Sequence, residues 1–206
     1  VDAAWWHPGG AATASAHHDG SVHVISAMRL VSRKRPLAML RVLEQARAVL
    51  DPAVALRATI VGEGPQRRVM EHRLRARGLT WVQMPGRMDK DELRALHQGA
   101  DVYLSAAQLE AFGIAALEAQ AAGLPIVARR GTGTDDFVKD GVSGLLADSD
   151  AALALAGLAA RAGAARLLLL APLQAWHQLS RATRLLPDGL ELALARSPIP
   201  LVVIMK

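Results

Sequence analysis

The sequence predicts an α/β fold in which helices flank a doubly wound parallel sheet. Short runs of strand-forming residues alternate with helix-length segments from residue 21 to about residue 160, and this alternation is typical of parallel βαβ units. Hydrophobic residues make up 51% of the chain and charged residues 21%, as in an ordinary globular domain. The 206 residues suffice for one large domain, or for one and a half small ones.

The strand predictions rest on runs of four or five residues that are mostly apolar or β-branched. The run at 58–61 is the β-branched example, and it ends at the loop sequence Gly62-Glu63-Gly64-Pro65. Since strands and helices alternate at a regular pitch, all the strands fit one doubly wound sheet. In chain order we expect them at 22–26, 58–61, 80–83, 101–105, 125–128 and 143–147.

The helix predictions rest on apolar spacing and on residues that start or stop helices. Leucines at 37, 40, 43 and 50 lie at helical spacing, and Asp51-Pro52 stops that helix. Asp89 is a suitable N-cap residue, and Glu92 three positions later completes a capping-box pattern. In chain order we expect helices at 36–50, 66–77, 89–98 and 112–122, with another that begins at residue 150.

The two ends of the chain lack this alternation. Residues 1–20 are typical of a Gly-, Ala- and His-rich linker or loop, and residues 163–206 form a C-terminal tail of uncertain structure. The first residues lack a basic region followed by an apolar core, so we expect no signal peptide. No apolar run reaches the ~18 residues that span a bilayer. Because the first residue is Val1 rather than Met, we expect the chain to be part of a longer product.

Composition excludes several kinds of chemistry. The chain has no cysteine, which excludes a disulfide scaffold, a thiolate metal site and a cysteine nucleophile. Its 24 Lys and Arg exceed its 19 Asp and Glu, for a net charge of +5, and this modest excess suits a phosphorylated small molecule or an anionic membrane. Aromatic residues are only 3% and are not interleaved with the basic ones, so we expect no nucleic-acid partner.

The loop after the expected fourth strand carries the most informative pattern. In a doubly wound sheet the ligand crevice lies at the carboxyl ends of the strands. Glu110 precedes the helix at 112–122 and Glu118 lies about two turns into it, so both carboxylates can reach one side of that helix. Gly113 lets a ligand approach the backbone, and the free N–H groups of the first turn suit a phosphate.

The loop after the first strand supplies positive charge. Arg29 offers a planar fork to phosphate oxygens, and Lys34 offers a point charge. The first and fourth strands are neighbours at the switch point of such a sheet. The sequence therefore predicts a site where these two cations meet Glu110 and Glu118 around a diphosphate.

Five segments together resemble one known family. Their sequences and their order along the chain are similar to those of the C-terminal, nucleotide-sugar-binding domain of family-4 retaining glycosyltransferases of the GT-B fold. The resemblance covers roughly residues 22–160, and its most specific part is the pair Glu110 and Glu118 around Phe112-Gly113. In chain order the segments are Arg29-Leu30-Val31-Ser32-Arg33-Lys34, Ile60-Val61-Gly62-Glu63-Gly64-Pro65, Met84-Pro85-Gly86, Ala100-Asp101-Val102 and Glu110-Ala111-Phe112-Gly113 with Glu118-Ala119.

The resemblance implies a Rossmann-like donor-binding domain over residues 21–162, which is one half of a GT-B architecture. Arg29 and Lys34 would hold the donor diphosphate and neutralise the leaving group. Glu110 would bind hydroxyls of the transferred sugar, and Glu118 would bind the ribose hydroxyls. The other binding positions that it implies are Gly62, Glu63 and Gly64 at the pocket floor, Met84 beside the base, and the backbone N–H groups of Phe112, Gly113 and Ile114 beside the distal phosphate.

The resemblance also implies a reaction, in which a hexosyl group passes from a UDP- or GDP-linked sugar to an acceptor hydroxyl with its anomeric configuration kept. It implies no protein nucleophile, no metal and no other cofactor. The family's N-terminal domain, which carries the acceptor site, is missing from the matched segment and is an expected partner. We expect a bacterial, cytoplasmic protein with peripheral contact to an anionic membrane at its inner face. The basic helix at 66–77 would make that contact, although a solvated face is the simpler interpretation of it.

The sequence departs from the family pattern at positions that affect the shape of the sugar pocket. Met28 and Arg35 stand where glycines are usual, and the turn at 131–136 replaces the usual Gly-Gly-x-Pro-Glu. Two alternatives stay open: a nucleotide-sugar epimerase or phosphorylase, and a non-catalytic nucleotide-sugar-binding module or fragment without turnover. A dinucleotide site is disfavoured because Arg67 replaces the third glycine of its fingerprint. Asp148-Ser149-Asp150 is interpreted as a helix N-cap rather than a metal site.

Overall fold

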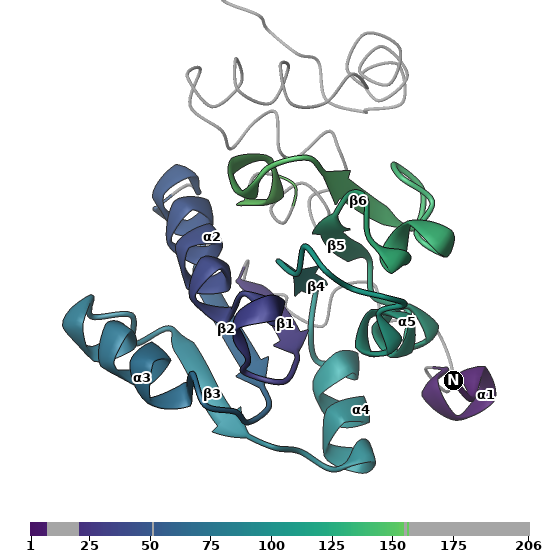
Figure 1. Ribbon diagram of the computed structural model, residues 1–206, viewed down its shortest axis with the longest axis horizontal. Helices are drawn as coiled ribbons and strands as arrows, with labels where there is room; N and C mark the ends of the chain where they lie inside the picture. The colour runs from purple at the N-terminus through teal and green to yellow at the C-terminus, as the bar shows by residue number, and fades with distance from the viewer. Residues whose placement is uncertain (8–20, 51, 155, 157–206) are drawn as a thin grey trace, which may run out of the picture.

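The computed structural model describes residues 1–7, 21–50, 52–154 and 156. Within them, six strands form one all-parallel sheet with the order β3-β2-β1-β4-β5-β6 (Figure 1). The order reverses between β1 and β4, and this is the switch point at which crevices form. The predicted doubly wound parallel sheet is therefore confirmed. The strands are β1 (Val22–Ala27), β2 (Leu56–Val61), β3 (Val82–Gly86), β4 (Val102–Ser105), β5 (Ile126–Arg129) and β6 (Gly144–Ala147).

Helices cover both faces of the sheet. Side chains alternate between the faces along a strand, so Val24 of β1 packs in one core cluster and its neighbour Ile25 in the other. The first cluster includes residues of α2, of α3 and of the helix that begins at residue 150, whereas the second includes residues of α4 and α5. The bounds are α2 (Pro36–Val49), α3 (Arg67–Ala76), α4 (Lys90–Gln98) and α5 (Ile114–Ala121).

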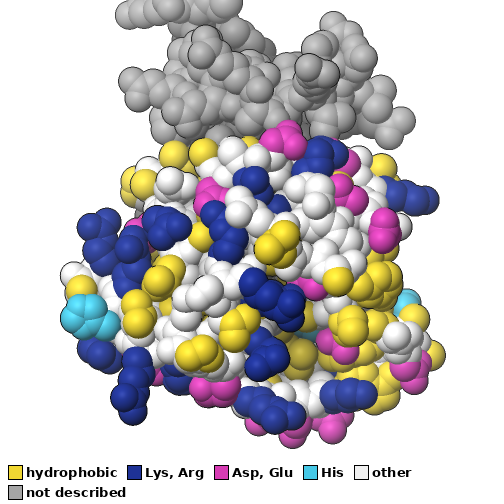
Figure 2. Space-filling view, viewed as in Figure 1, with side chains coloured by type: hydrophobic (Ala, Val, Ile, Leu, Met, Phe, Trp, Pro, Cys, Tyr) yellow, Lys and Arg dark blue, Asp and Glu magenta, His cyan; other side chains and the backbone are white. Residues whose placement is uncertain are grey.

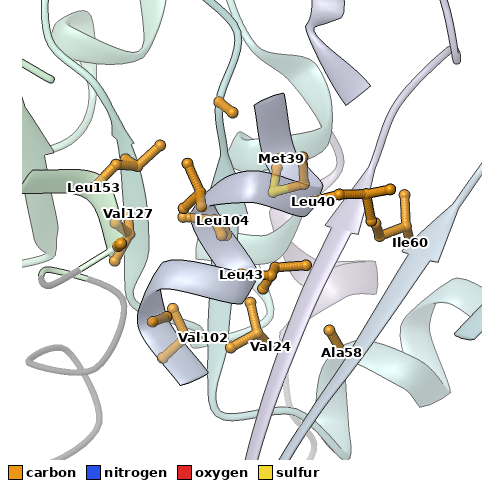
Figure 3. Packing of buried hydrophobic residues seen from close by; sticks show 14 of the residues in the cluster. Val24, Met39, Leu40, Leu43, Ala58, Ile60, Val102, Leu104, Val127 and Leu153 are labelled. Atoms are coloured by element: carbon orange, nitrogen blue, oxygen red, sulfur yellow. The ribbon is translucent and has the colours of Figure 1, made fainter. Parts of the chain in front are cut away.

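The larger core lies between α2 and the sheet (Figure 3). Met39, Leu40 and Leu43 of α2 are at most 2% exposed. Because each such side chain contributes about 1.5–3 kcal/mol when buried, this core holds in place the strands whose ends carry the cleft described below. Their neighbours in the cluster include Val24, Ala58, Ile60, Val102, Leu104, Val127 and Leu153.

Several element boundaries differ from the sequence predictions, and the differences in β3 and α5 affect the site. β3 begins two residues later than expected and runs on to Gly86, so that Met84 lies in the strand rather than in the loop after it. α5 begins at Ile114 rather than at residue 112. The reason for the second difference is Gly113, which has φ 82°, a left-handed conformation that cannot continue a right-handed helix.

Both predicted helix caps are present. The Asp89 carboxylate accepts a hydrogen bond from the N–H of Glu92, and the Glu92 carboxylate accepts one from the N–H of Asp89, each at 2.8 Å. At the helix that begins at residue 150, Ser149 rather than an aspartate makes the cap. Its hydroxyl accepts a hydrogen bond from the N–H of Ala152 at 3.1 Å, which leaves the carboxylate of Asp150 free for another role.

The first seven residues are not the loop that the sequence predicts. Residues Ala3–Trp6 form a short helix, α1, which Asp2 caps. Trp6 is 3% exposed, and its ring lies 5.2 Å from the ring of His97 in α4. Burial of the indole stabilises this helix against the domain, a tertiary effect that a Gly- and Ala-rich composition does not indicate. Residues 8–20 of the predicted linker and the predicted tail at 163–206 lie outside the described residues.

Candidate functional site

A cleft of about 280 Å³ opens at the carboxyl ends of β1 and β4, where the strand order reverses. Its walls come from the ends of these two strands, from the β1–α2 loop, from the β4–α5 loop and from the first turn of α5. The charged residues that line it are Arg29, Arg33, Lys34 and Glu110. The cleft therefore lies at the sheet edge where the sequence predicts a ligand, and its lining carries both positive and negative charge.

Lys34 and Glu110 form an ion pair in this cleft, in which the Lys34 ammonium donates a hydrogen bond to Oε2 of Glu110. The two residues are 76 positions apart in the sequence, and the pairing of β1 with β4 brings their loops together. Their side chains are only 19% and 17% exposed. Solvent and salt consequently screen this pair less than they screen an ion pair on the surface.

The Glu110 carboxylate also contacts the backbone that leads into α5. Its Oε1 accepts a hydrogen bond from the N–H of Gly113 at 3.2 Å. Burial tends to raise the pKa of Glu110, but the Lys34 ammonium and the N–H groups of Gly113 and Phe112 outweigh it and lower this pKa below its ordinary value. Glu110 is therefore an anion at neutral pH, and it occupies donors that an external anion could use.

The next N–H groups, at the start of α5, are free to bind an anion. The hydrogen bond from the N–H of Leu117 to the carbonyl of Gly113, at 2.9 Å, begins the regular helix pattern. Residues 114–116 precede it, line the cleft, and make no backbone N–H hydrogen bond to another described residue. Unpaired N–H groups and the positive end of the helix dipole together favour an anion at this place.

Arg29 and Arg33 bring further positive charge to the cleft. Both are exposed, and neither guanidinium makes a hydrogen bond or an ion pair with another residue in the described part of the chain. Because Lys34 and Glu110 neutralise each other, these two arginines leave the lining with a net positive charge. Arg33 was not among the predicted site residues. Its position one residue before Lys34, in a loop expected at the crevice, is the signal that could have identified it.

Glu118 lies farther along α5, outside the set of residues that line the cleft. Burial raises its pKa, although the nearby charges of Lys90 and the Val1 amino group partly offset this rise. Burial also raises the pKa of Tyr103, and the carboxylates of Glu110 and Glu118 both add to that rise. Both carboxylates therefore lie close enough to Tyr103 to affect its pKa. Of the two, Glu110 lines the cleft together with Lys34 and Glu118 does not.

The phenol of Tyr103 joins the two central strands beneath the cleft. Its hydroxyl donates a hydrogen bond to the carbonyl of Ala27 at 3.0 Å, and the residue is 3% exposed. This buried contact links the last residue of β1 to β4. It helps to fix the distance between the two loops that carry Lys34 and Glu110.

The glycine loop after β2 supports the cleft without being part of its described lining. Gly62 has φ 129°, and a Cβ atom there would lie 1.9 Å from the carbonyl oxygen of Met28, so only glycine permits this approach. The N–H of Leu30 also donates to the carbonyl of Glu63 at 2.9 Å. The loop at 62–64 therefore holds in place the segment that carries Arg29.

Arg67 ties this glycine loop to the end of β3. Its guanidinium donates to the carboxylate of Glu63 at 2.6 Å, to that of Glu71 at 2.7 Å and to the carbonyl of Met84 at 2.9 Å. Met84 itself is partly buried against the larger core. The predicted binding positions Glu63 and Met84 are thus brought together through Arg67, although the basic pattern of its helix predicts a solvated face for it.

The rest of the basic helix α3 is divided between internal and exposed arginines. Arg73 pairs with Glu44 of α2 at 2.9 Å, and Arg77 approaches the same carboxylate at 3.5 Å. Arg68 and Arg75 are exposed. The simple interpretation of this helix as a solvated face is therefore wrong for Arg67 and Arg73, which hold elements of the fold together.

The residues predicted to lie beside the distal phosphate form the entrance to α5. Phe112 and Ile114 are 46% and 61% exposed. A Cβ atom at Gly113 would lie 2.8 Å from Cγ2 of Thr134, so both the left-handed backbone and the close approach require glycine here. Gly113 thereby sets the direction in which the first N–H groups of α5 point.

In the part of the chain that the structure describes, no helix is long and apolar enough to cross a membrane. The same residues contain no group of three or more His, Asp or Glu side chains arranged to hold a metal ion.

The sequence matches a known family and several curated relatives. The family model of the group 1 glycosyl transferases matches residues 13–163. The D-inositol 3-phosphate glycosyltransferase of Salinispora tropica is 39% identical over 129 residues, which are 57% of this chain and 27% of that protein. The putative colanic acid biosynthesis glycosyltransferase WcaL of Escherichia coli is 30% identical over 142 residues, which are 66% of this chain and 34% of that protein. The chain thus spans about a third or less of the length of these relatives.

Solved structures share the fold. The apo form of the lipopolysaccharide outer core galactosyltransferase WaaB gives a TM-score of 0.64 at 17% identity, over 88% of this chain and 51% of that one. HepE of Anabaena in complex with UDP and glucose gives a TM-score of 0.57 at 20% identity, over 86% of this chain and 44% of that one. The predicted GT-B type of Rossmann-like sheet is therefore confirmed. Because the family model covers well over half of the sequence, the chain belongs to the group 1 glycosyltransferases.

Proposed function

We propose that the chain binds a nucleoside diphosphate sugar, linked to UDP or GDP, as the donor half of a retaining glycosyltransferase. The cleft at the switch point carries this proposal, since Arg29, Lys34 and the free N–H groups of α5 surround one space. These positive charges and hydrogen-bonding N–H groups match the negative charge and the many acceptor oxygens of a diphosphate. The complex of the structurally similar HepE with UDP and glucose supports the same class of donor.

In this proposal the diphosphate replaces the Glu110 carboxylate as the partner of Lys34. Lys34 transfers its hydrogen bond to a phosphate oxygen, and Arg29 binds the same group from the exposed side of the cleft. Glu110 is then released toward hydroxyls of the sugar. We assign the ribose hydroxyls to Glu118, whose partly buried carboxylate shares the surroundings of Tyr103 with Glu110.

The proposed reaction exchanges one bond at the anomeric carbon of the sugar. The bond to the diphosphate oxygen breaks, its electron pair stays with the diphosphate, and the acceptor oxygen forms the new bond as its hydroxyl gives its proton to the leaving group. Arg29, Lys34 and the N-terminal end of α5 stabilise the charge that develops on the diphosphate. A hexose as the transferred group and retention of configuration are parts of the proposal that the family resemblance supports.

We further propose that residues 21–162 are the donor domain and that an acceptor-binding domain outside these 206 residues completes the enzyme. The aligned segments are only 27% and 34% of the matched relatives, which supports this division. We therefore expect the chain by itself to bind donor but to transfer sugar slowly.

Contact with an anionic membrane is a separate part of the proposal. On the face shown in Figure 2, Lys and Arg side chains gather on the side where α3 lies. Arg68 and Arg75 of that helix are exposed, so they can bind lipid phosphates without loss of an internal contact. Sedimentation with anionic vesicles should decrease in a variant that carries both Arg68→Glu and Arg75→Glu, and equal sedimentation would rule this contact out.

Calorimetric titration tests the donor site. We expect UDP or GDP, and the matching nucleotide sugar, to bind with a stoichiometry of one. Arg29→Ala removes a charge-assisted contact of about 1.5–3 kcal/mol, so affinity should fall about ten- to hundredfold. Arg75→Ala removes another exposed arginine, which lies on α3, and should leave affinity unchanged. The proposal fails if no nucleotide binds at millimolar concentration, or if the two variants weaken binding equally.

A further inference from the structure

Arg35 has a backbone conformation that arginine rarely adopts. Its φ of 55° is the one positive φ at a non-glycine residue in the described part of the chain. The left-handed conformation costs a residue with a side chain about 1–2 kcal/mol. Other contacts of Arg35 must therefore offset this cost.

Three hydrogen bonds from the Arg35 guanidinium provide those contacts. Nη1 donates to the carbonyl of Ala106 at 3.0 Å and to Oδ1 of Asp150 at 2.9 Å, and Nη2 donates to Oδ2 of Asp150 at 2.8 Å. The contact with Asp150 is bidentate, which is a strong geometry for an arginine and a carboxylate. Arg129 adds a longer contact to the same carboxylate at 3.7 Å.

Arg35 and its partners Ala106 and Asp150 lie on three separate segments at the carboxyl edge of the sheet. Arg35 directly follows Lys34, at the end of the 3₁₀ helix η1 (Ser32–Lys34). Ala106 is fully buried and begins the loop that leads to Glu110. Asp150 begins the helix that follows β6. The Arg35 side chain therefore links the loop of Lys34 to the loop of Glu110, and it anchors both to the helix that follows β6.

We propose that Arg35 is a positioning residue, which holds the ammonium of Lys34 beside Glu110 by tying the Lys34 loop to Ala106 and Asp150, and which thereby sets the affinity for the diphosphate. The effect on affinity rests on the proposed function. The dependence of the Lys34–Glu110 contact on Arg35 does not, because it concerns the protein without any ligand.

We call the contacts of the Arg35 guanidinium with Ala106 and Asp150 the Arg35 clamp. Arg35→Gly removes this clamp without adding backbone strain, because glycine readily adopts a φ of 55°. Lys34 can be observed directly by NMR after ¹³C-methylation of the four lysines of the full chain, with Lys34→Arg to identify its signal. Without nucleotide, we expect the Lys34 signal in Arg35→Gly to move toward that of the exposed Lys90. UDP affinity should fall about fivefold or more, which is about 1 kcal/mol.

A second variant and a matched control complete the experiment. Asp150→Asn weakens the same clamp from its other side and should shift the Lys34 signal in the same direction. Combined with Arg35→Gly it should add nothing further, since both changes remove one shared interaction. Arg130→Ala is the control, because Arg130, like Arg35, forms ion pairs with aspartate, here with Asp140 and Asp148, yet it touches neither loop of the Lys34–Glu110 pair. It should change neither the signal nor the affinity.

An unchanged Lys34 signal in Arg35→Gly would overturn the proposal, even if the variant unfolds at a lower temperature, because Arg35 would then act on stability alone. Unchanged UDP affinity, in a chain that binds UDP, would also overturn it. If the unaltered chain binds no UDP, the proposed function fails, while the Lys34 signal still decides whether Arg35 positions the pair.

Discussion

Replacement of Glu110 by glutamine should strengthen the binding of UDP, whereas replacement of Lys34 by methionine should weaken it. The Glu110 carboxylate pairs with Lys34 and accepts a hydrogen bond from the N–H of Gly113. It therefore occupies donors that a phosphate needs, and its charge repels the diphosphate. UDP has no transferred sugar, so the glutamine variant loses no sugar contact in this experiment.

The exposure of the pair sets the size of the effect. With side chains 19% and 17% exposed, the pair lies between a surface ion pair, which contributes about 0–1 kcal/mol, and a fully buried one. Release of Lys34 should therefore contribute about 1 kcal/mol, or about fivefold tighter binding of UDP. Lys34→Met removes a charge-assisted hydrogen bond of about 1.5–3 kcal/mol, so affinity should fall about ten- to hundredfold.

Calorimetric titration at neutral pH and constant low salt measures both variants, with Arg75→Ala as the control. The nucleotide sugar should respond differently from UDP, because Glu110→Gln weakens the contact to the sugar that we assign to the carboxylate. The preference for UDP-sugar over UDP should therefore decrease in this variant. Weaker binding of UDP by Glu110→Gln would refute the reasoning, since Glu110 would then support the diphosphate rather than compete with it.

Three further predictions concern stability. Glu118→Gln should raise the free energy of unfolding at about pH 7 but not at about pH 3 in denaturant titrations, because burial raises the pKa of Glu118 and disfavours its ionised form. His97→Phe should flatten the pH dependence of stability. Burial lowers the pKa of His97 to about 4, so as the pH falls the unfolded chain binds a proton at this side chain before the folded chain does. The free energy of unfolding of the unaltered protein should therefore decrease by about 1.4 kcal/mol per pH unit as the pH falls from about 6.5 to about 4. An equal slope in both proteins would contradict this. Gly62→Ala should cost more than the about 1–3 kcal/mol of backbone strain, because its Cβ atom would overlap the carbonyl of Met28. Gly78→Ala, where φ is 62° and nothing lies within 4 Å, should cost only about 1–2 kcal/mol, and equal losses in thermal unfolding would disprove the role of the close approach.

Much of the fold could be predicted because its signals are local. The β-branched run at 58–61 lies within β2, and the capping box of Asp89 and Glu92 forms as the spacing of the two residues requires. Each signal depends on neighbours within a strand or a helical turn. The adjacency of β1 and β4 followed from the rules of doubly wound sheets, so the loops of Lys34 and Glu110 could be expected at one edge.

The environments of individual side chains were harder to predict, because residues in similar stretches of sequence can have different neighbours in the folded structure. Arg67 looks like the other arginines of its helix, and it differs only because Glu63 and the Met84 carbonyl lie within reach of it. Trp6 lies in a stretch typical of a linker, but it is buried beside His97. No local pattern indicates these contacts, since they depend on how loops and helices pack against one another.

Sequence alone was thus enough to identify the kinds of elements, the family, and most of the charged residues at the ligand edge of the sheet. Three-dimensional packing was needed to learn which charges meet. Lys34 contacts Glu110 across 76 positions, and Arg35 contacts Asp150 across 115, while Glu118 stays outside the cleft lining. Such contacts depend on shifts of about an ångström in the positions of loops, and the close packing of the whole core sets those positions.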